Sequence, residues 1–286
     1  MAKDNGGRAA AHAKTDFATI AGLTLAVCGI LGGLFLEGGQ VSDVVQYTAA
    51  MIVVLGTAGA VMVTTPLALI LAALRRVKDL FRETTPPAEA VIAQLMVFAR
   101  QARRTGIVSL EQEANGLSDP FLKKALSLAV DGTDLQDLRR IMELEIDMAE
   151  RRGEAEAKVF ETAGGYAPTI GIIGAVLGLI QVMKHLDDLE RVGHGIAVAF
   201  VATVYGVGLA NLVLLPAGNK LKARLELSLE FKTLSLEGVI GIAEGMNPRL
   251  LESKLEPFLE QRAGGRSNEA SSAPRRASAP APVVLR

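Results

Sequence analysis

The sequence is poor in the residues that build catalytic sites, metal sites and disulfide frameworks. Its 286 residues include one cysteine, three histidines and no tryptophan. The single Cys28 excludes a disulfide framework within the chain, and no spacing typical of metal ligands is present. There is also no Ser-His-Asp grouping and no phosphate-binding glycine loop. We therefore predict no enzyme, no catalytic residue, no cofactor and no metal site.

Charge is also scarce, both in total and in four long stretches. The formal net charge of −1 leaves no basic excess, so no nucleic-acid partner is predicted. Phe17–Leu36, Tyr47–Leu74, Thr162–Met183 and Gly195–Asn219 contain no Asp, Glu, Lys, Arg or His. As helices that rise about 1.5 Å per residue, all four can cross a bilayer core. One such stretch would be compatible with a buried core helix, but four predict an all-α polytopic membrane protein with four transmembrane helices.

The charged residues that flank these stretches predict their orientation. Lys and Arg follow the second and fourth stretches and precede the third, whereas the short segments 37–46 and 184–194 carry no basic excess. The positive-inside rule then places both termini and the large middle segment in the cytoplasm.

The chain accordingly divides into six segments. The membrane parts are 17–74, with helices one and two and a short periplasmic loop, and 162–219, with helices three and four. A cytoplasmic N-terminus covers 1–16, a helical cytoplasmic domain 75–161, and cytoplasmic C-terminal helices 220–263. The tail 264–286 is rich in Pro, Ala and Ser and is predicted to be disordered. A helix from Thr133 to about Val159 is predicted to continue into the third membrane helix.

Small residues recur on one face of each of the last two stretches. Gly171, Gly174 and Gly178 do so in the third, and Ala199, Ala202 and Gly206 are among those in the fourth. Inside a membrane such faces are where helices pack closely.

Few polar residues lie at membrane depth. Thr203 is eight residues from the outer end of the fourth stretch, which corresponds to roughly 12 Å. Ala175 has the same spacing in the third stretch, so we expect the two positions to face each other. In an alternative interpretation, the Thr203 hydroxyl only bonds the carbonyl four residues earlier. Since no ionisable side chain lies in the four stretches, ion transport would require a carboxylate from another subunit.

Three prolines interrupt the apolar stretches. Pro66, Pro168 and Pro216 are predicted to lie at one level, toward the cytoplasmic ends of their helices. Each removes a helix hydrogen bond and permits a kink. They are either tolerated kinks or a set of hinges that transmits membrane events to the cytoplasmic helices.

Five motifs resemble the A-type stator subunits of the bacterial flagellar motor, over nearly the whole chain. The longest are YAPTIGIIGAVLGLIQVMKHL at 166–186 and GIAVAFVATVYGVGLANLVLLPAGNKLKARL at 195–225. The others are ILGGLFLEGG at 30–39, RRTGIVSLE at 103–111 and EGMNPRLLESKL at 244–255.

The resemblance implies a bacterial inner-membrane protein, in contact with lipid, that conducts ions and generates torque. In that family five A subunits form a ring around two B subunits, each with a membrane Asp and a peptidoglycan-binding domain, and the ring acts on a rotor switch protein. By position, Pro168 and Pro216 match the functional prolines, Thr203 the pore threonine, and Arg103 and Glu111 the rotor-facing charge pair. These two charges are also compatible with an ordinary solvated face.

The resemblance also bears on the conducted ion. Sodium-type relatives carry threonines on both the third and the fourth membrane helix, and the third-helix position here is Ala175. Its methyl offers no oxygen ligand, so protons are predicted. Two alternatives to the stator remain open: a TolQ/ExbB-like energy-transducing ring subunit that serves outer-membrane transport, and a membrane scaffold without ion flow.

Overall fold

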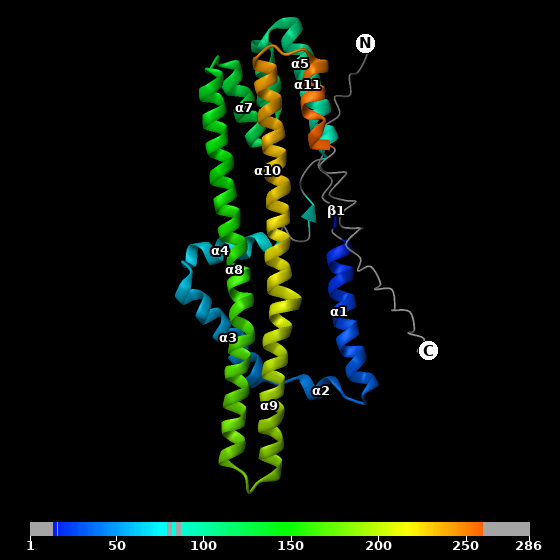
Figure 1. Cartoon of the computed structure of the whole chain (residues 1–286), viewed down its shortest axis with the longest axis vertical. Helices are drawn as coiled ribbons and strands as arrows, with labels where there is room; N and C mark the ends of the chain where they lie inside the picture. The colour runs from blue at the N-terminus through cyan, green and yellow to red at the C-terminus, as the bar shows by residue number, and fades with distance from the viewer. Residues whose placement is uncertain (1–13, 16, 79–81, 84–86, 260–286) are drawn as a thin grey trace, which may run out of the picture. The chain divides into compact units, whose positions relative to one another are not determined.

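The computed structural model describes residues 14–15, 17–78, 82–83 and 87–259 (Figure 1). Every long element in these ranges is a helix, so the all-α class is confirmed. The exception within them is one antiparallel pair of two-residue strands, β1 (Lys14–Thr15) and β2 (Arg82–Glu83). The predictions for the first 13 residues and for the tail 264–286 lie outside the described residues.

The chain divides into two compact units. Unit one combines residues 1–85 with 143–229, and unit two combines residues 86–142 with 230–286. Two long helices, α8 (Leu135–Lys184) and α10 (Leu215–Ala243), contribute residues to both units.

Unit one contains the apolar helices. They are α1 (Phe17–Leu36), the short α2 (Val41–Val44), α3 (Tyr47–Thr64), α4 (Leu67–Arg76), the second part of α8, and α9 (Leu189–Gly208). Among the residues that the structure describes, three helical runs are long and apolar enough to cross a membrane: α3, α8 and the run from α9 through α10. The apolar part of α1, Ile20–Leu36, is shorter.

The second apolar stretch is not one helix, which corrects its prediction as a single helix with a kink. The helix α3 ends at Thr64, and Thr65 is extended with φ −132° and ψ 131°. Proline favours an extended conformation in the residue before it and has no N–H for a helix bond, so Pro66 separates α3 from α4. An ion pair at 2.9 Å between Arg76 Nε and the buried Glu156 carboxylate attaches the end of α4 to α8.

The predicted continuation of the middle segment into the third apolar stretch is confirmed. The helix α8 runs for 50 residues without interruption and includes both Gly153 and Pro168. The fourth stretch also continues beyond its expected end, through the π-helical turn η3 (Leu209–Leu214) into α10. This wider turn ends at Leu214, two residues before Pro216.

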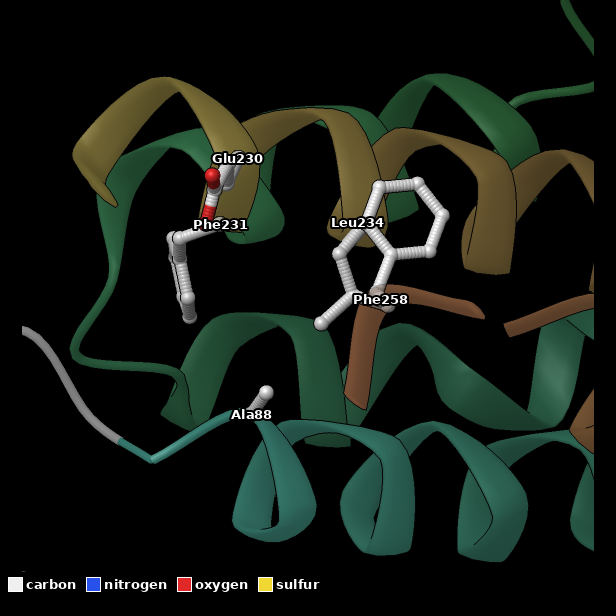
Figure 2. Close-up of a pocket in the computed structure, with 5 residues that line it drawn as sticks. All are labelled: Ala88, Glu230, Phe231, Leu234 and Phe258. Atoms are coloured by element: carbon white, nitrogen blue, oxygen red, sulfur yellow. The ribbon is translucent and has the colours of Figure 1, made fainter. Parts of the chain in front are cut away.

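Unit two is a helical domain with a conventional apolar core. It contains α5 (Ala88–Thr105), the 3-10 turn η2 (Ile107–Leu110), α6 (Glu111–Gly116), α7 (Pro120–Val130) and α11 (Pro248–Leu255), with the adjoining ends of α8 and α10. Leu95, Leu110, Phe121 and Leu138 are among its fully buried side chains. A cavity of about 10 Å³ between α5, α10 and Phe258 is too small for a ligand (Figure 2).

Candidate functional site

The helices α8 and α9 meet backbone to backbone along a seam of small residues. A Cβ atom added at Gly171 would lie 2.9 Å from the Ala202 carbonyl oxygen, and one at Gly178 would lie 2.8 Å from the Gly195 carbonyl oxygen. One at Gly206 would lie 2.6 Å from the Ala167 carbonyl oxygen. Any larger side chain at these three positions would push the helices apart, so the predicted close packing of the two faces is confirmed.

The helix α3 covers one side of this pair. Its Ile52 lies beside Gly174, its Gly56 lies beside Ile170, and its Ala49 packs in a buried cluster with α9 residues Val201 and Ala202. The side of the α8–α9 pair that faces α3 is thereby fixed.

Thr203 and Ala175 lie on the other side. At the seam, a Cβ atom added at Gly174 would be 2.9 Å from the Ala202 Cβ atom, so these two residues are level. Ala175 and Thr203 each follow one of them, and each residue of an α-helix turns by about 100°. On α8 and α9, the residues that contact α3, such as Ile170 and Val201, lie on one side of the seam. Ala175 and Thr203 lie about 100° beyond Gly174 and Ala202 in the other direction, so they are on the face opposite α3. The structure therefore brings the two predicted positions to one level and one face, and both are half-buried.

The Thr203 hydroxyl makes the internal bond that the alternative interpretation expects. Its Oγ1 donates to the Ala199 carbonyl oxygen at 3.3 Å. A hydroxyl has one donor and two acceptor lone pairs, so this bond leaves the oxygen free to accept a hydrogen bond from water. The internal bond and a role in an ion pathway are compatible.

Tyr205 is a residue that the sequence analysis missed. Its hydroxyl donates to the Val44 carbonyl oxygen and accepts from the Gln46 backbone N–H at 3.3 Å. Val44 is the last residue of α2 and Gln46 directly precedes α3, so one side chain of α9 satisfies both ends of the turn between them. The available signal was a tyrosine in the middle of a charge-free stretch, because a phenolic hydroxyl in apolar surroundings needs a partner.

The three prolines occupy three different settings, and the prediction that they share a level is wrong. Pro66 separates two helices, whereas Pro168 lies inside α8 beside Gly206, with its Cα atom 3.2 Å from where a Cβ atom there would be. Pro216 is exposed and follows the π-helical turn. Gly218, two residues beyond it, contacts Ala157 and Glu161 of α8, well before Pro168 along that helix.

An ion pair joins α8 and α10 close to Pro216. Lys222 Nζ lies 2.6 Å from a Glu161 carboxylate oxygen. The hydrogen bond to Glu161 raises the pKa of Lys222 above its usual value, so Lys222 is charged at neutral pH. Together with the Arg76–Glu156 pair, it fixes α4 and α10 to the same part of α8.

Arg103 and Glu111 lie on a rigid corner of unit two. Arg103 is in the last turn of α5 and Glu111 is the first residue of α6, and both are exposed. Between them Gly106 has a φ of +87°, a conformation that favours glycine and permits the sharp turn. Ser109 holds the corner, because its hydroxyl donates to the Gly106 carbonyl at 2.7 Å and its own carbonyl accepts from Gln101 at 3.1 Å.

A groove of about 770 Å³ runs between α5 and α11. Apolar Ile92, Met96 and Val97 line it together with charged residues that include Arg100, one turn before Arg103. Within the described ranges, no group of three or more His, Cys, Asp or Glu side chains that could hold a metal ion is found.

Comparisons with known proteins agree with this architecture. The Motility protein A N-terminal family matches residues 20–106, and the MotA/TolQ/ExbB proton channel family matches residues 113–231. Motility protein A of Helicobacter pylori is 37% identical over 244 residues, which is 85% of this chain and 95% of that protein.

Two solved structures are similar over most of their length. The structure of Campylobacter jejuni MotAB matches with a TM-score of 0.81 and 37% identity, covering 85% of this chain and 95% of that one. The flagellar MotAB stator complex from Bacillus subtilis matches with a TM-score of 0.79 and 35% identity, covering 84% of this chain and 95% of that one. This chain therefore belongs to the MotA/TolQ/ExbB proton channel family.

Proposed function

We propose that this chain is the ion-conducting, torque-generating A subunit of a bacterial flagellar stator. The observation that carries the proposal is its likeness to the MotAB stator complexes along nearly their whole length, at 35–37% identity. The match to the Motility protein A N-terminal family at residues 20–106 favours a stator over a TolQ/ExbB-like ring subunit.

The chain acts as a multi-pass protein of the bacterial inner membrane, with four membrane helices and both termini in the cytoplasm. Many apolar side chains of unit one are uncovered within a single chain, such as Leu25, Val63 and Phe200. Lipid and further subunits are the partners that such surfaces require. An assembly of five copies around two B subunits covers part of these surfaces, and lipid covers the rest.

The ion carrier is an Asp on the membrane helix of a B subunit, whose peptidoglycan-binding domain anchors that subunit. This assignment is supported by the absence of ionisable side chains from the four charge-free stretches. The α8–α9 face opposite α3 is the face that the ring presents to the B subunit, since it carries Thr203 and Ala175. The Thr203 oxygen orders water along the path to the Asp.

Protons are the conducted ion. A dehydrated sodium ion needs several oxygen ligands at once, whereas a proton moves between single acceptors. At the level of Thr203, the neighbouring helix offers only the methyl group of Ala175. A sodium ion there would be under-coordinated in every copy of the ring.

Pro168 and Pro216 act as hinges between the ion pathway and the rest of the chain. In α8, Pro168 lacks the N–H that would bond the Gly164 carbonyl, so the helix is locally free to bend. In α10, Pro216 follows a π-helical turn, a feature that is frequent at functional sites. The Lys222–Glu161 pair keeps α8 and α10 together beside the hinges, so that they move as one.

The exposed corner of Arg103 and Glu111 engages the rotor switch protein. A corner held by Gly106 and Ser109 presents both charges in a fixed relation, which suits electrostatic steering of a partner.

Reconstitution tests the proposal. The chain is expressed with its B subunit in a bacterium that lacks its own stators, and swimming is measured. Proton flux into liposomes is then measured for the chain with and without the B subunit. We expect swimming in cells and flux only with the B subunit. A chain that conducts nothing with any wall-binding B subunit would be a membrane scaffold, and one that purifies with a TonB-like partner would be an energy-transducing ring subunit.

A further inference from the structure

One tyrosine hydroxyl connects segments of unit one that are far apart in the sequence. Tyr205 Oη donates to the Val44 carbonyl and accepts from the Gln46 N–H, across more than 150 residues. Carbonyls at the end of a helix and N–H groups at the start of the next have no partner within their own helices. The hydroxyl therefore pairs one group of each kind.

The side chain of Tyr205 lies on the opposite face of α9 from Thr203. Tyr205 follows Thr203 by two residues, which places it about 200° further around α9. Tyr205 packs against the buried cluster of Ala49, Val201 and Ala202, and so points toward α3. With Tyr205 fixed on that side, Thr203 is turned to the opposite face of the helix.

The seam fits α9 to α8 by close contact between small residues. Its contacts are backbone atoms and hydrogen or methyl groups at Gly171, Gly178, Ala202 and Gly206. Such a surface permits close approach, and the larger side chain of Val182 packs against it at Gly195. The hydroxyl of Tyr205 adds a directional contact, which favours one rotation of α9 more strongly than close packing alone.

We propose that Tyr205 is a positioning residue, a rotational lock that holds α9 against the α2–α3 turn and so keeps Thr203 directed at the ion pathway. The presence of a pathway at Thr203 rests on the proposed function, but the lock itself rests on the contacts within unit one. The hydroxyl acts through Thr203 and does not itself contact the conducted ion.

The test measures the orientation of position 203 directly. Thr203→Cys is introduced together with Cys28→Ala, and the full chain is assembled with its B subunit in native membrane vesicles. The labelling rate by a water-soluble maleimide is compared with and without Tyr205→Phe. We expect Tyr205→Phe to slow labelling, because loss of one net hydrogen bond lowers the equilibrium constant for the held rotation about fivefold.

The matched control is Tyr47→Phe, which removes the same hydroxyl from a residue that is 82% exposed at the start of α3. It should leave the labelling rate unchanged. In the otherwise wild-type chain, Tyr205→Phe should lower proton flux while the amount of complex with the B subunit stays constant, a combination that a purely structural residue would not give.

Unchanged labelling in the Tyr205→Phe chain would overturn the proposal. So would a Thr203→Cys chain that reacts with no aqueous reagent even when Tyr205 is present. Failure of the proposed function is seen separately, because the wild-type chain with its B subunit would then drive neither swimming nor proton flux.

Discussion

The α8–α9 pair of unit one and the helices of unit two are held together by different means. In unit one, α8 and α9 touch through bare backbone at Gly171, Gly178 and Gly206. In unit two, large side chains such as Leu95 and Phe121 fill the space between the helices. Water drives apolar side chains together, whereas lipid is as apolar as leucine and favours only close contact between helices. The difference is the one expected between helices packed in lipid and helices packed in water.

The polar contacts also differ between unit two and the charge-free stretches of unit one. In unit two, the Glu237 carboxylate accepts from both Arg139 and Lys254 at 2.7 Å. Burial alone would raise the pKa of Glu237, but the hydrogen bonds from these two cations outweigh it and lower the pKa below its usual value. In the charge-free stretches of unit one, the polar contacts are neutral hydroxyl bonds to the backbone, such as those of Thr203 and Tyr205.

The largest effect is expected where the seam is broken. Gly171→Leu places a side chain against the Ala202 carbonyl, at a cost at or above the ~3 kcal/mol of ordinary overpacking, because backbone cannot repack. We expect no recoverable complex with the B subunit and no swimming. The control is Gly165→Leu on the same helix, where an added Cβ atom meets nothing within 4 Å. Copurification that survives Gly171→Leu would show that the seam is looser than its distances indicate.

The second-largest effect is expected at Pro168, where a substitution should stop swimming without changing the yield of the complex. Pro168→Ala restores the missing helix bond to the Gly164 carbonyl, so α8 should remain intact or become stiffer. We expect a complex of normal yield and a complete loss of swimming. Pro120→Ala is the control, since proline at the first position of α7 replaces no internal hydrogen bond. Normal swimming by the Pro168→Ala strain would rule out a hinge at this position.

The third effect belongs to the core of unit two. Leu95 is fully buried, so Leu95→Ala should destabilise the chain by about 2–5 kcal/mol through lost burial and a new cavity. Chemical unfolding in detergent, followed by protease sensitivity of the 86–142 segment, measures this change. Val97→Ala on the same helix is 51% exposed and should change stability by no more than about 0.5 kcal/mol. Equal effects of the two changes would contradict the water-driven core.

The long helices were predictable because their signals are local. Charge-free stretches and small-residue faces identified the apolar helices and the seam, and the helix expected from Thr133 to about Val159 continues into the third apolar stretch as α8. The break at Pro66 was not predictable, because a proline is compatible with both a kink and a break. The contacts that accompany the break, such as Arg76 with Glu156, join residues 80 positions apart.

The site was predictable only in part, for the same reason. The level shared by Ala175 and Thr203 follows from helix geometry, and the bond from Thr203 to Ala199 is local. The tyrosine at position 205 indicates that its hydroxyl needs a hydrogen-bond partner, but nothing near it in the sequence shows that the partner is Val44. No residue type in 209–214 specifies the π-helical turn before Pro216.

A smaller effect is expected at the corner of unit two. Arg103→Glu should reduce swimming without abolishing it, because steering by exposed charges is salt-screened and tolerates single losses. A charge change of opposite sign in the rotor switch protein should partly restore speed. Arg140→Glu, at another exposed arginine of unit two, is the control. If the double change of Arg103→Glu with Glu111→Lys leaves swimming intact, both residues belong to an ordinary solvated face.

The last prediction is that removal of sodium leaves the swimming speed unchanged. Proton coupling requires only single acceptors in sequence, which water ordered by Thr203 and a carboxylate of the B subunit provide. Sodium requires several oxygens together, and leaving it poorly coordinated in an apolar site costs several kcal/mol. Since Ala175 contributes a methyl group at this level in every copy, swimming speed should not change when potassium replaces sodium, and it should collapse with a protonophore. A speed that follows external sodium at constant proton-motive force would show that oxygens other than those at positions 175 and 203 coordinate the ion.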